Sequence, residues 1–165
     1  MFRRRAAIVL LAGSAIALSG CVMLPEVDGP DPDPAPGASD AALTCDGELR
    51  LDQPGEYRVG DCDELEIAGQ NIEVVAGEVG SLVIRGDDNE VETGSLGSVD
   101  IEGQDNEIDA TDVGDVEIAG NRNSIDSRGD VGAVAIQGNE NEIEYGGDVG
   151  SVDDGGDRNE VRQER

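Results

Sequence analysis

Six glycines recur at a near-constant interval, and this recurrence constrains the fold more than any other feature of the sequence. Their successive spacings are 17, 17, 17, 18 and 18 residues by subtraction, for Gly69, Gly86, Gly103, Gly120, Gly138 and Gly156. Before each of the first five glycines stand two apolar residues separated by one residue. Five residues after each of the six glycines stands a Val or an Ile. This alternation is typical of short β-strands and leaves no segment long enough for a helix.

A second corner is marked by a third apolar column in which each residue is followed directly by glycine. Its members are Val79, Leu96, Val113, Val131 and Val149. Each repeat therefore reads as strand, glycine corner, strand and valine–glycine corner, and one such repeat cannot bury its apolar side chains alone. Stacking the repeats at the inter-strand spacing of about 4.8 Å does bury them. The sequence predicts an all-β protein, a single-stranded parallel β-helix (β-solenoid) of 17–18-residue coils.

Asparagine stands three residues after five of the six glycines. These residues are Asn89, Asn106, Asn123, Asn141 and Asn159. Each lies two positions before an inward Val or Ile, so the same parity directs its side chain inward at a corner. Stacked asparagines can then form a structural ladder of side-chain hydrogen bonds along the coils. The alternative is that these are turn residues chosen for an unusual backbone conformation.

The N-terminus has the pattern of an export signal. Arg3, Arg4 and Arg5 precede an apolar run that ends in Leu18-Ser19-Gly20-Cys21. This ending resembles the lipobox of bacterial lipoprotein signals, which implies acylation of Cys21 after removal of the signal peptide, residues 1–20. The expected location is extracytoplasmic, anchored to the bacterial cell membrane by the N-terminal lipid.

Residues 21–42 are expected to form the lipidated N-terminus and a disordered linker. Five of the six prolines lie here and alternate with aspartates, which favours an extended polyproline conformation. A linker without a binding role is the simpler interpretation, and a recognition motif is the alternative.

Cys45 and Cys62 are the only other cysteines, and a pair left over in an exported chain suggests a disulfide. Their separation is 17 residues by subtraction, which is one coil, so their Cα atoms would be about 5 Å apart, within disulfide range. A metal pair is the weaker alternative, because the chain has no histidine and no further thiol. The repeat pattern weakens across residues 45–60, which we expect to form an irregular N-terminal cap of the repeat domain, residues 43–165.

The last coil has the features of a polar C-terminal cap, residues 151–165. Asp154 occupies the inward position that isoleucine fills in earlier coils, and Arg158, Arg162 and Arg165 lie nearby. A carboxylate at this position would end the core and discourage end-to-end growth.

The repeat resembles a family of secreted and lipid-anchored bacterial proteins, the domain of unknown function 3060. The likeness is carried by Cys62-Asp63-Glu64-Leu65-Glu66-Ile67-Ala68-Gly69 and by the segment from Val99 to Ile108, within a span of roughly residues 45–161. This chain has Glu and Asp around the asparagine where the family tends to have Thr or Ser. The resemblance implies a β-solenoid-like fold and no known activity.

The net charge of −27 argues against nucleic acid as a partner, because no basic stripe could replace phosphate counterions. Acids flank the inward residues in coil after coil, so like charges should stack along the solenoid and repel. Calcium could relieve this repulsion, and weak divalent cation binding is one possible consequence. The alternative is a solvated, solubilising face, since the glycine-rich calcium-binding nonapeptide is absent.

Catalysis has little support in the residue types present. The chain contains no histidine, lysine or tryptophan, which removes most general bases, nucleophiles and sugar-stacking side chains. We therefore expect no catalytic, cofactor-binding or metal-ligating residues and a non-enzymatic, lipid-anchored structural or interaction module. A calcium-dependent or carbohydrate-binding module is the alternative, and a polysaccharide-active β-helix enzyme is a remote one that rests on fold analogy alone.

Overall fold

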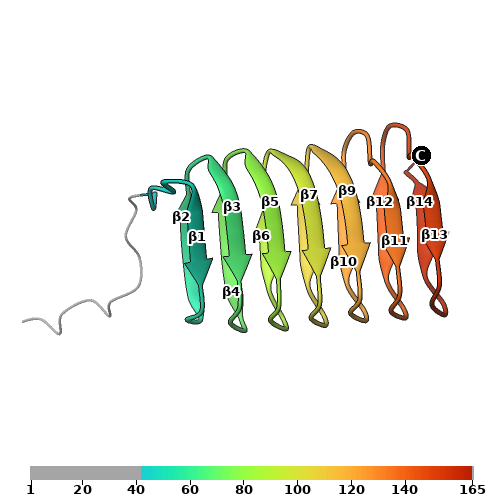
Figure 1. Ribbon diagram of the computed structural model, residues 1–165, viewed down its shortest axis with the longest axis horizontal. Helices are drawn as coiled ribbons and strands as arrows, with labels where there is room; N and C mark the ends of the chain where they lie inside the picture. The colour runs from blue at the N-terminus through green and yellow to red at the C-terminus, as the bar shows by residue number, and fades with distance from the viewer. Residues whose placement is uncertain (1–41, 165) are drawn as a thin grey trace, which may run out of the picture. The chain divides into compact units, whose positions relative to one another are not determined.

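The computed structural model describes residues 42–164, which form a β-solenoid of parallel strands and no helix. Each coil contributes one strand to each of two seven-stranded parallel sheets, and the strands of a sheet lie side by side along the stack (Figure 1). The predicted fold class is confirmed. Within the described range no helix could span a membrane.

The two sheets are named here by their strands. The odd-numbered sheet contains β1 (Glu48–Leu51), β3 (Cys62–Ile67), β5 (Val79–Ile84), β7 (Ser95–Ile101), β9 (Asp112–Ile118), β11 (Val134–Ile136) and β13 (Val152–Asp154). The even-numbered sheet contains β2 (Gly55–Val59), β4 (Ile72–Ala76), β6 (Glu90–Glu92), β8 (Glu107–Ala110), β10 (Ser124–Ser127), β12 (Glu142–Tyr145) and β14 (Glu160–Gln163).

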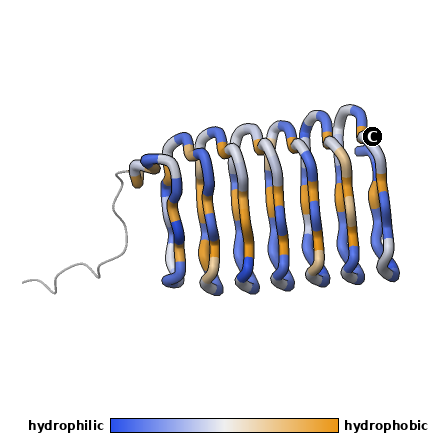
Figure 2. The backbone as a smooth tube through the Cα atoms, in the orientation of Figure 1, coloured by the Kyte–Doolittle hydropathy of each residue, from blue (hydrophilic) through white to orange (hydrophobic). Residues whose placement is uncertain are grey.

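The register explains why the repeat folds in this way. Each strand pairs with the strand one period away, so that Ile84 lies beside Ile101 and Val91 beside Ile108. The columns predicted to point inward form the core, in which Ile84, Ile101 and Ile108 have no exposed surface. Hydrophilic and hydrophobic stretches follow one another along the coils and recur from coil to coil in Figure 2. Each buried aliphatic side chain stabilises the stack by roughly 1.5 to 3 kcal/mol relative to full exposure.

Two corners separate the sheets. The glycine–asparagine corner leads from each odd-numbered strand to the next even-numbered strand, and the valine–glycine corner leads back to the odd-numbered sheet. The extra residue of the 18-residue coils lies at the valine–glycine corner, where Gly129 and Gly147 stand in the longer loops. The strand after the first longer loop is correspondingly short, with three residues in β11 against seven in β9.

The first coil is regular, whereas residues 45–60 were expected to be an irregular cap. β1 and β2 pair in register with β3 and β4, placing Leu49 beside Leu65 and Tyr57 beside Val74. The alternation of inward and outward side chains is sufficient for regular strands in the first coil. Inward side chains at every second residue fill the core even where the corner glycine and asparagine are missing. Leu43 adds a further bridge to Val59 at the open end.

The last coil ends the core as its sequence predicts. Asp154 pairs with Ile136 in the register of the odd-numbered sheet but is exposed. Its Oδ1 accepts hydrogen bonds from the Gly156 N–H at 2.9 Å and from Asn159 Nδ2 at 2.7 Å. The aspartate therefore closes the open end of the stack with local polar contacts rather than with apolar packing.

Candidate functional site

The five predicted asparagines form one continuous ladder at the glycine–asparagine corner. Nδ2 of each donates to Oδ1 of the next at 3.0 to 3.1 Å, from Asn89 through Asn106, Asn123 and Asn141 to Asn159. Each accepting Oδ1 also receives the backbone N–H of the preceding asparagine. The first four are 1 to 2 % exposed, so the ladder is an internal structural element and not an accessible site.

The ladder uses the full hydrogen-bonding capacity of each amide. The second Nδ2 hydrogen goes to a glycine carbonyl of the preceding coil, as from Asn106 to Gly86 O at 3.1 Å. At the start, where Ile72 replaces asparagine, its backbone N–H donates to Asn89 Oδ1 at 3.0 Å. Throughout residues 42–164, no buried side-chain nitrogen or oxygen lacks a partner. Asparagines chosen only for an unusual turn conformation would not form these hydrogen bonds from coil to coil. The interpretation as a ladder therefore holds over the interpretation as turn residues.

The second residue after each of the six corner glycines adopts a left-handed backbone, which the sequence reasoning missed. The φ angles are 55 to 60° for Asn71, Asp88, Asp105, Arg122, Glu140 and Arg158. Asn and Asp adopt this conformation more readily than other non-glycine residues, and they occupy three of the six positions. Their fixed place two residues after the glycine was the sequence signal, but a fixed place does not by itself specify a left-handed conformation.

These left-handed residues carry ion pairs between coils. Arg122 contacts Asp105 of the preceding coil through Nε at 2.7 Å and Nη2 at 2.6 Å. Arg158 contacts Glu140 of the preceding coil through Nη2 at 2.5 Å. The hydrogen bonds from Arg122 lower the pKa of the Asp105 carboxyl below its ordinary value. From Asp105 onward this column therefore alternates in charge, whereas neighbouring columns accumulate acids.

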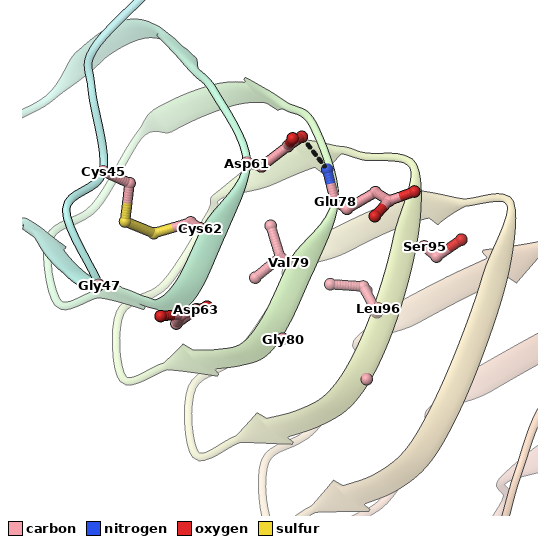
Figure 3. A pocket seen from close by; sticks show the side chains of 11 residues that line it. Cys45, Gly47, Asp61, Cys62, Asp63, Glu78, Val79, Gly80, Ser95 and Leu96 are labelled. Atoms are coloured by element: carbon pink, nitrogen blue, oxygen red, sulfur yellow. Dashed lines mark hydrogen bonds between the residues drawn. A yellow bond between two sulfur atoms is a disulfide. The ribbon is translucent and has the colours of Figure 1, made fainter.

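Carboxylates connect the coils at the valine–glycine corner, and this role was also missed. Oδ1 of Asp61 accepts the backbone N–H of Glu78 at 3.0 Å (Figure 3), and Oδ1 of Asp130 accepts that of Asp148 at 2.8 Å. Asp112 accepts from Asp130 N at 3.2 Å. The signal was present in the acids that recur immediately before the valine of this corner. These acids are structural acceptors and not only a solvated coat.

The predicted disulfide between Cys45 and Cys62 is confirmed. Their Cα atoms are 5.2 Å apart, and the bond joins the first coil to the start of β3 (Figure 3). A hollow of about 450 Å³ lies beside it and includes Val79, Gly80 and Leu96 among its lining residues. A Cβ at Gly80 would lie 2.6 Å from the Asp63 carbonyl oxygen, so this glycine is required by the tight stacking of corners.

The outer face of the even-numbered sheet, which we call the even face, bears two columns of acids in register. Glu73, Glu90 and Glu107 stand directly beside one another on successive strands. Glu92, Asp109 and Asp126 form the second column. Two carboxylates at this spacing repel by roughly 1 kcal/mol in water. The expected stacking of like charges is thus present, and Arg162 offsets it only at the last coils by pairing with Glu142, Glu144 and Glu160.

The outer face of the odd-numbered sheet, the odd face, combines small side chains with charged ones. Ser81, Ser98, Ala133 and Ser151 lie in one column, and Val83 and Ala135 lie in the next. A groove of about 500 Å³ crosses this face from β5 to β13, and its acidic members are Asp100, Asp115, Glu117 and Asp153. We refer to it as the odd-face groove.

A compact ion cluster lies on the same face toward the N-terminal coils. Arg50 Nη1 is 2.5 Å from Glu66 Oε1, and Arg85 Nη1 contacts the same oxygen. The hydrogen bond from Arg50 is the main cause that lowers the pKa of Glu66. No group of three or more His, Cys, Asp or Glu side chains is placed to hold a metal ion in the part of the chain that the structure describes.

The model of the family described as protein of unknown function (DUF3060) matches residues 101–157. No curated protein and no solved structure matches the chain at a significant level.

The match covers the coils from the end of β7 to just beyond β13. It supports the resemblance over a shorter range than the span of roughly 45–161 that the repeat columns suggested, and the segment from Cys62 to Gly69 lies outside it. The description of the family assigns no function. Cys21, the signal peptide and the linker of the sequence interpretation lie outside the described residues.

Proposed function

We propose that this chain is a non-enzymatic, lipid-anchored extracytoplasmic protein that presents an acidic β-solenoid as a structural or interaction module. The observation that carries the proposal is that the recurring polar side chains of the two corners form hydrogen bonds between coils. The buried amides of the asparagine ladder and the carboxylates of the valine–glycine corner hold one coil to the next. What remains for a partner is the repeated outer surface of the two sheets.

The anchoring part of the proposal rests on Leu18-Ser19-Gly20-Cys21 behind an apolar run. The disulfide suits an oxidising compartment outside the cytoplasm. The high negative charge favours attachment through lipid over electrostatic attraction to anionic headgroups, and it disfavours nucleic acid as a partner.

Fractionation of cells that express the full chain tests the anchor. The wild-type protein should partition into the detergent phase of a membrane extract, and Cys21→Ser should leave that phase. The matched control is the double substitution Cys45→Ser and Cys62→Ser, which removes two cysteines but leaves the lipidation pattern intact and should remain membrane-bound. Unchanged partitioning of Cys21→Ser would overturn the proposed anchor.

A cation-dependent module is the second candidate, favoured by the carboxylates in register on the even face. Calcium binding would relieve their repulsion and raise the melting temperature, by an amount that grows with the logarithm of the calcium concentration above the dissociation constant. Thermal unfolding is compared in chelator and in millimolar calcium at matched ionic strength, with magnesium as the control cation. A calcium-specific stabilisation that is lost in Glu90→Gln with Glu107→Gln would support this candidate. Its absence would leave the acids as a solvated coat.

A further inference from the structure

We propose that the odd-face groove binds an extended, cationic polypeptide segment of about six residues. This deepens the interaction module proposed above by naming its partner class, and it rests on that proposal only in assuming that the outer surface is used. The groove crosses β5, β7, β9, β11 and β13, which lie side by side in one sheet (Figure 1). Five strands at about 4.8 Å span about 19 Å, which is the length of six extended residues at about 3.3 Å each.

The shape of the groove follows from small side chains that the register brings together. Ala133 follows Ser98 and Asp115 in its column and precedes Ser151, while Ala135 lies between Glu117 and Asp153. Short side chains lower the floor of the groove, so the backbone of a bound segment could approach closely and contact Val83 and Ala135. The even face carries Glu at most of the corresponding positions, and those longer side chains project outward.

The charge of the groove determines which occupant it suits. Its ionisable lining residues are all acidic, and within residues 42–164 no salt bridge engages Asp100, Glu117 or Asp153. Asp115 accepts the backbone N–H of Ala133 at 3.0 Å and also lines the groove. The basic residues of this face, Arg50 and Arg85, are already paired with Glu66 outside the groove. The groove thus presents carboxylates that lack cationic partners.

Charge also excludes the two occupants that the chain itself could supply. The segment from Val22 to Ala41 carries five acids and no basic residue, so the groove would repel it. A second copy of the chain brings a further net charge of −27. A lysine- or arginine-rich partner segment has the complementary charge. Close contact with the small side chains of the groove floor would distinguish specific binding from non-specific attraction to any acidic surface.

The test measures fluorescence anisotropy of a labelled hexalysine peptide with blocked ends, titrated with the purified full chain in nonionic detergent. Wild-type protein should bind it at near-physiological salt, and a blocked hexaserine peptide should not bind. Two charge-matched double variants then separate the faces. Asp100→Asn with Glu117→Gln changes adjacent strands of the groove, and Glu90→Gln with Glu107→Gln changes adjacent strands of the even face.

The groove variant should weaken binding about fivefold to tenfold, and the even-face variant should weaken it less than twofold.

A second pair of variants tests the shape of the groove without changing its charge. Ala135→Trp fills the groove and should weaken binding at least as much, whereas Ser124→Trp places the same bulk between Glu107 and Glu142 on the even face and should not. Thermal unfolding confirms that each variant is folded, and the charge pair decides the matter if a Trp variant is not.

Equal weakening by the two charge-matched variants would overturn the proposal and assign the binding to general electrostatics. Absence of hexalysine binding to the wild-type protein would overturn it outright. Neither outcome affects the Cys21→Ser fractionation, so failure of the groove and failure of the membrane anchor are distinguishable.

Discussion

Each of the two corners provides a side-chain acceptor for a backbone N–H of an adjacent coil, but the two corners use different side chains. At the glycine–asparagine corner, a buried amide receives the backbone N–H of the preceding coil, as Asn123 does from Asn106 at 3.1 Å. At the valine–glycine corner, an exposed carboxylate receives the backbone N–H of the following coil, as Asp130 does from Asp148 at 2.8 Å. An amide can both donate and accept, so it extends into a chain of bonds inside the core, whereas a carboxylate only accepts and must keep its charge in water.

The comparison teaches why one chain contains both devices. The ladder fills interior space with polar groups that satisfy one another, which fixes the vertical register of the coils. The carboxylates provide the same backbone contact at a corner open to solvent, and they add to the negative charge of the surface. Substitutions that exchange the two side chains should therefore have very unequal effects.

Asn123→Asp should have the largest effect, because it places a carboxylate in the buried ladder. The substitution keeps the shape but removes the Nδ2 donor to Gly103 O and Asn141 Oδ1. We expect the free energy of unfolding to fall by about 4 kcal/mol at neutral pH. At acidic pH the loss of stability should be smaller, because a protonated carboxyl group again provides one hydrogen-bond donor.

The reciprocal substitution Asp112→Asn is the control for Asn123→Asp. It leaves an acceptor oxygen facing Asp130 N in an exposed corner, so stability should change by less than about 0.5 kcal/mol. Urea denaturation measures both variants. A loss below about 1 kcal/mol for Asn123→Asp would show that the donor side of the ladder is dispensable.

Removal of the disulfide should have the next largest effect. The asparagine ladder does not reach the first coil, where Gly55 stands beside Ile72, and the Cys45–Cys62 bond holds that coil at the opposite corner. Cys45→Ala with Cys62→Ala should lower the free energy of unfolding by about 3 kcal/mol through loop-closure entropy. Hydrogen exchange should then rise in β1 and β2 and remain low in β8, and uniform acceleration along the chain would contradict this local role.

Asp130→Ala should have a smaller effect, because water can replace the lost acceptor at an exposed corner. We expect a loss of about 0.5 to 1 kcal/mol, and Asp130→Asn should restore nearly all of it by returning an acceptor oxygen. Thermal unfolding of the two variants measures the difference. Equal losses in both would mean that the charge, and not the hydrogen bond, matters at this corner.

Removal of the Arg122–Asp105 ion pair should have the smallest effect on stability, visible mainly in how stability depends on pH. Because the folded-state pKa of Asp105 lies below its ordinary value of 3.8, the pair contributes stability above that pH and loses it as the pH falls through the folded pKa. Arg122→Gln should reduce the slope of stability against pH between about pH 2 and 5. Arg128→Gln removes the same charge from an exposed position of the longer corner loop and should retain the slope.

Much of the architecture could be predicted from the repeat alone. The inward columns, the asparagine ladder and the disulfide all follow from period and parity, and Ile84, Asn106 and Cys62 lie where the spacing places them. The first coil was misjudged, because loss of the glycine and asparagine was taken as loss of regular structure although Leu49, Leu51 and Tyr57 preserve the alternation.

Other features required the folded chain. The left-handed turn residues share a conformation but no side-chain type, so Arg122 and Asp88 do not resemble each other in sequence. The corner carboxylates recur before the valine in the sequence, but only the folded chain shows which of them accept backbone N–H groups.

Period and parity dictate which side chains face inward, because the alternation of a strand and the identity of successive coils are local and repeat without reference to distant residues. The odd-face groove has a different origin. Its floor depends on which small side chains of successive coils, from Ser81 to Ser151, are brought into one column. Its electrostatic character depends on Arg50 and Arg85 being paired elsewhere, and these are relations of distance that exist only after the coils have stacked.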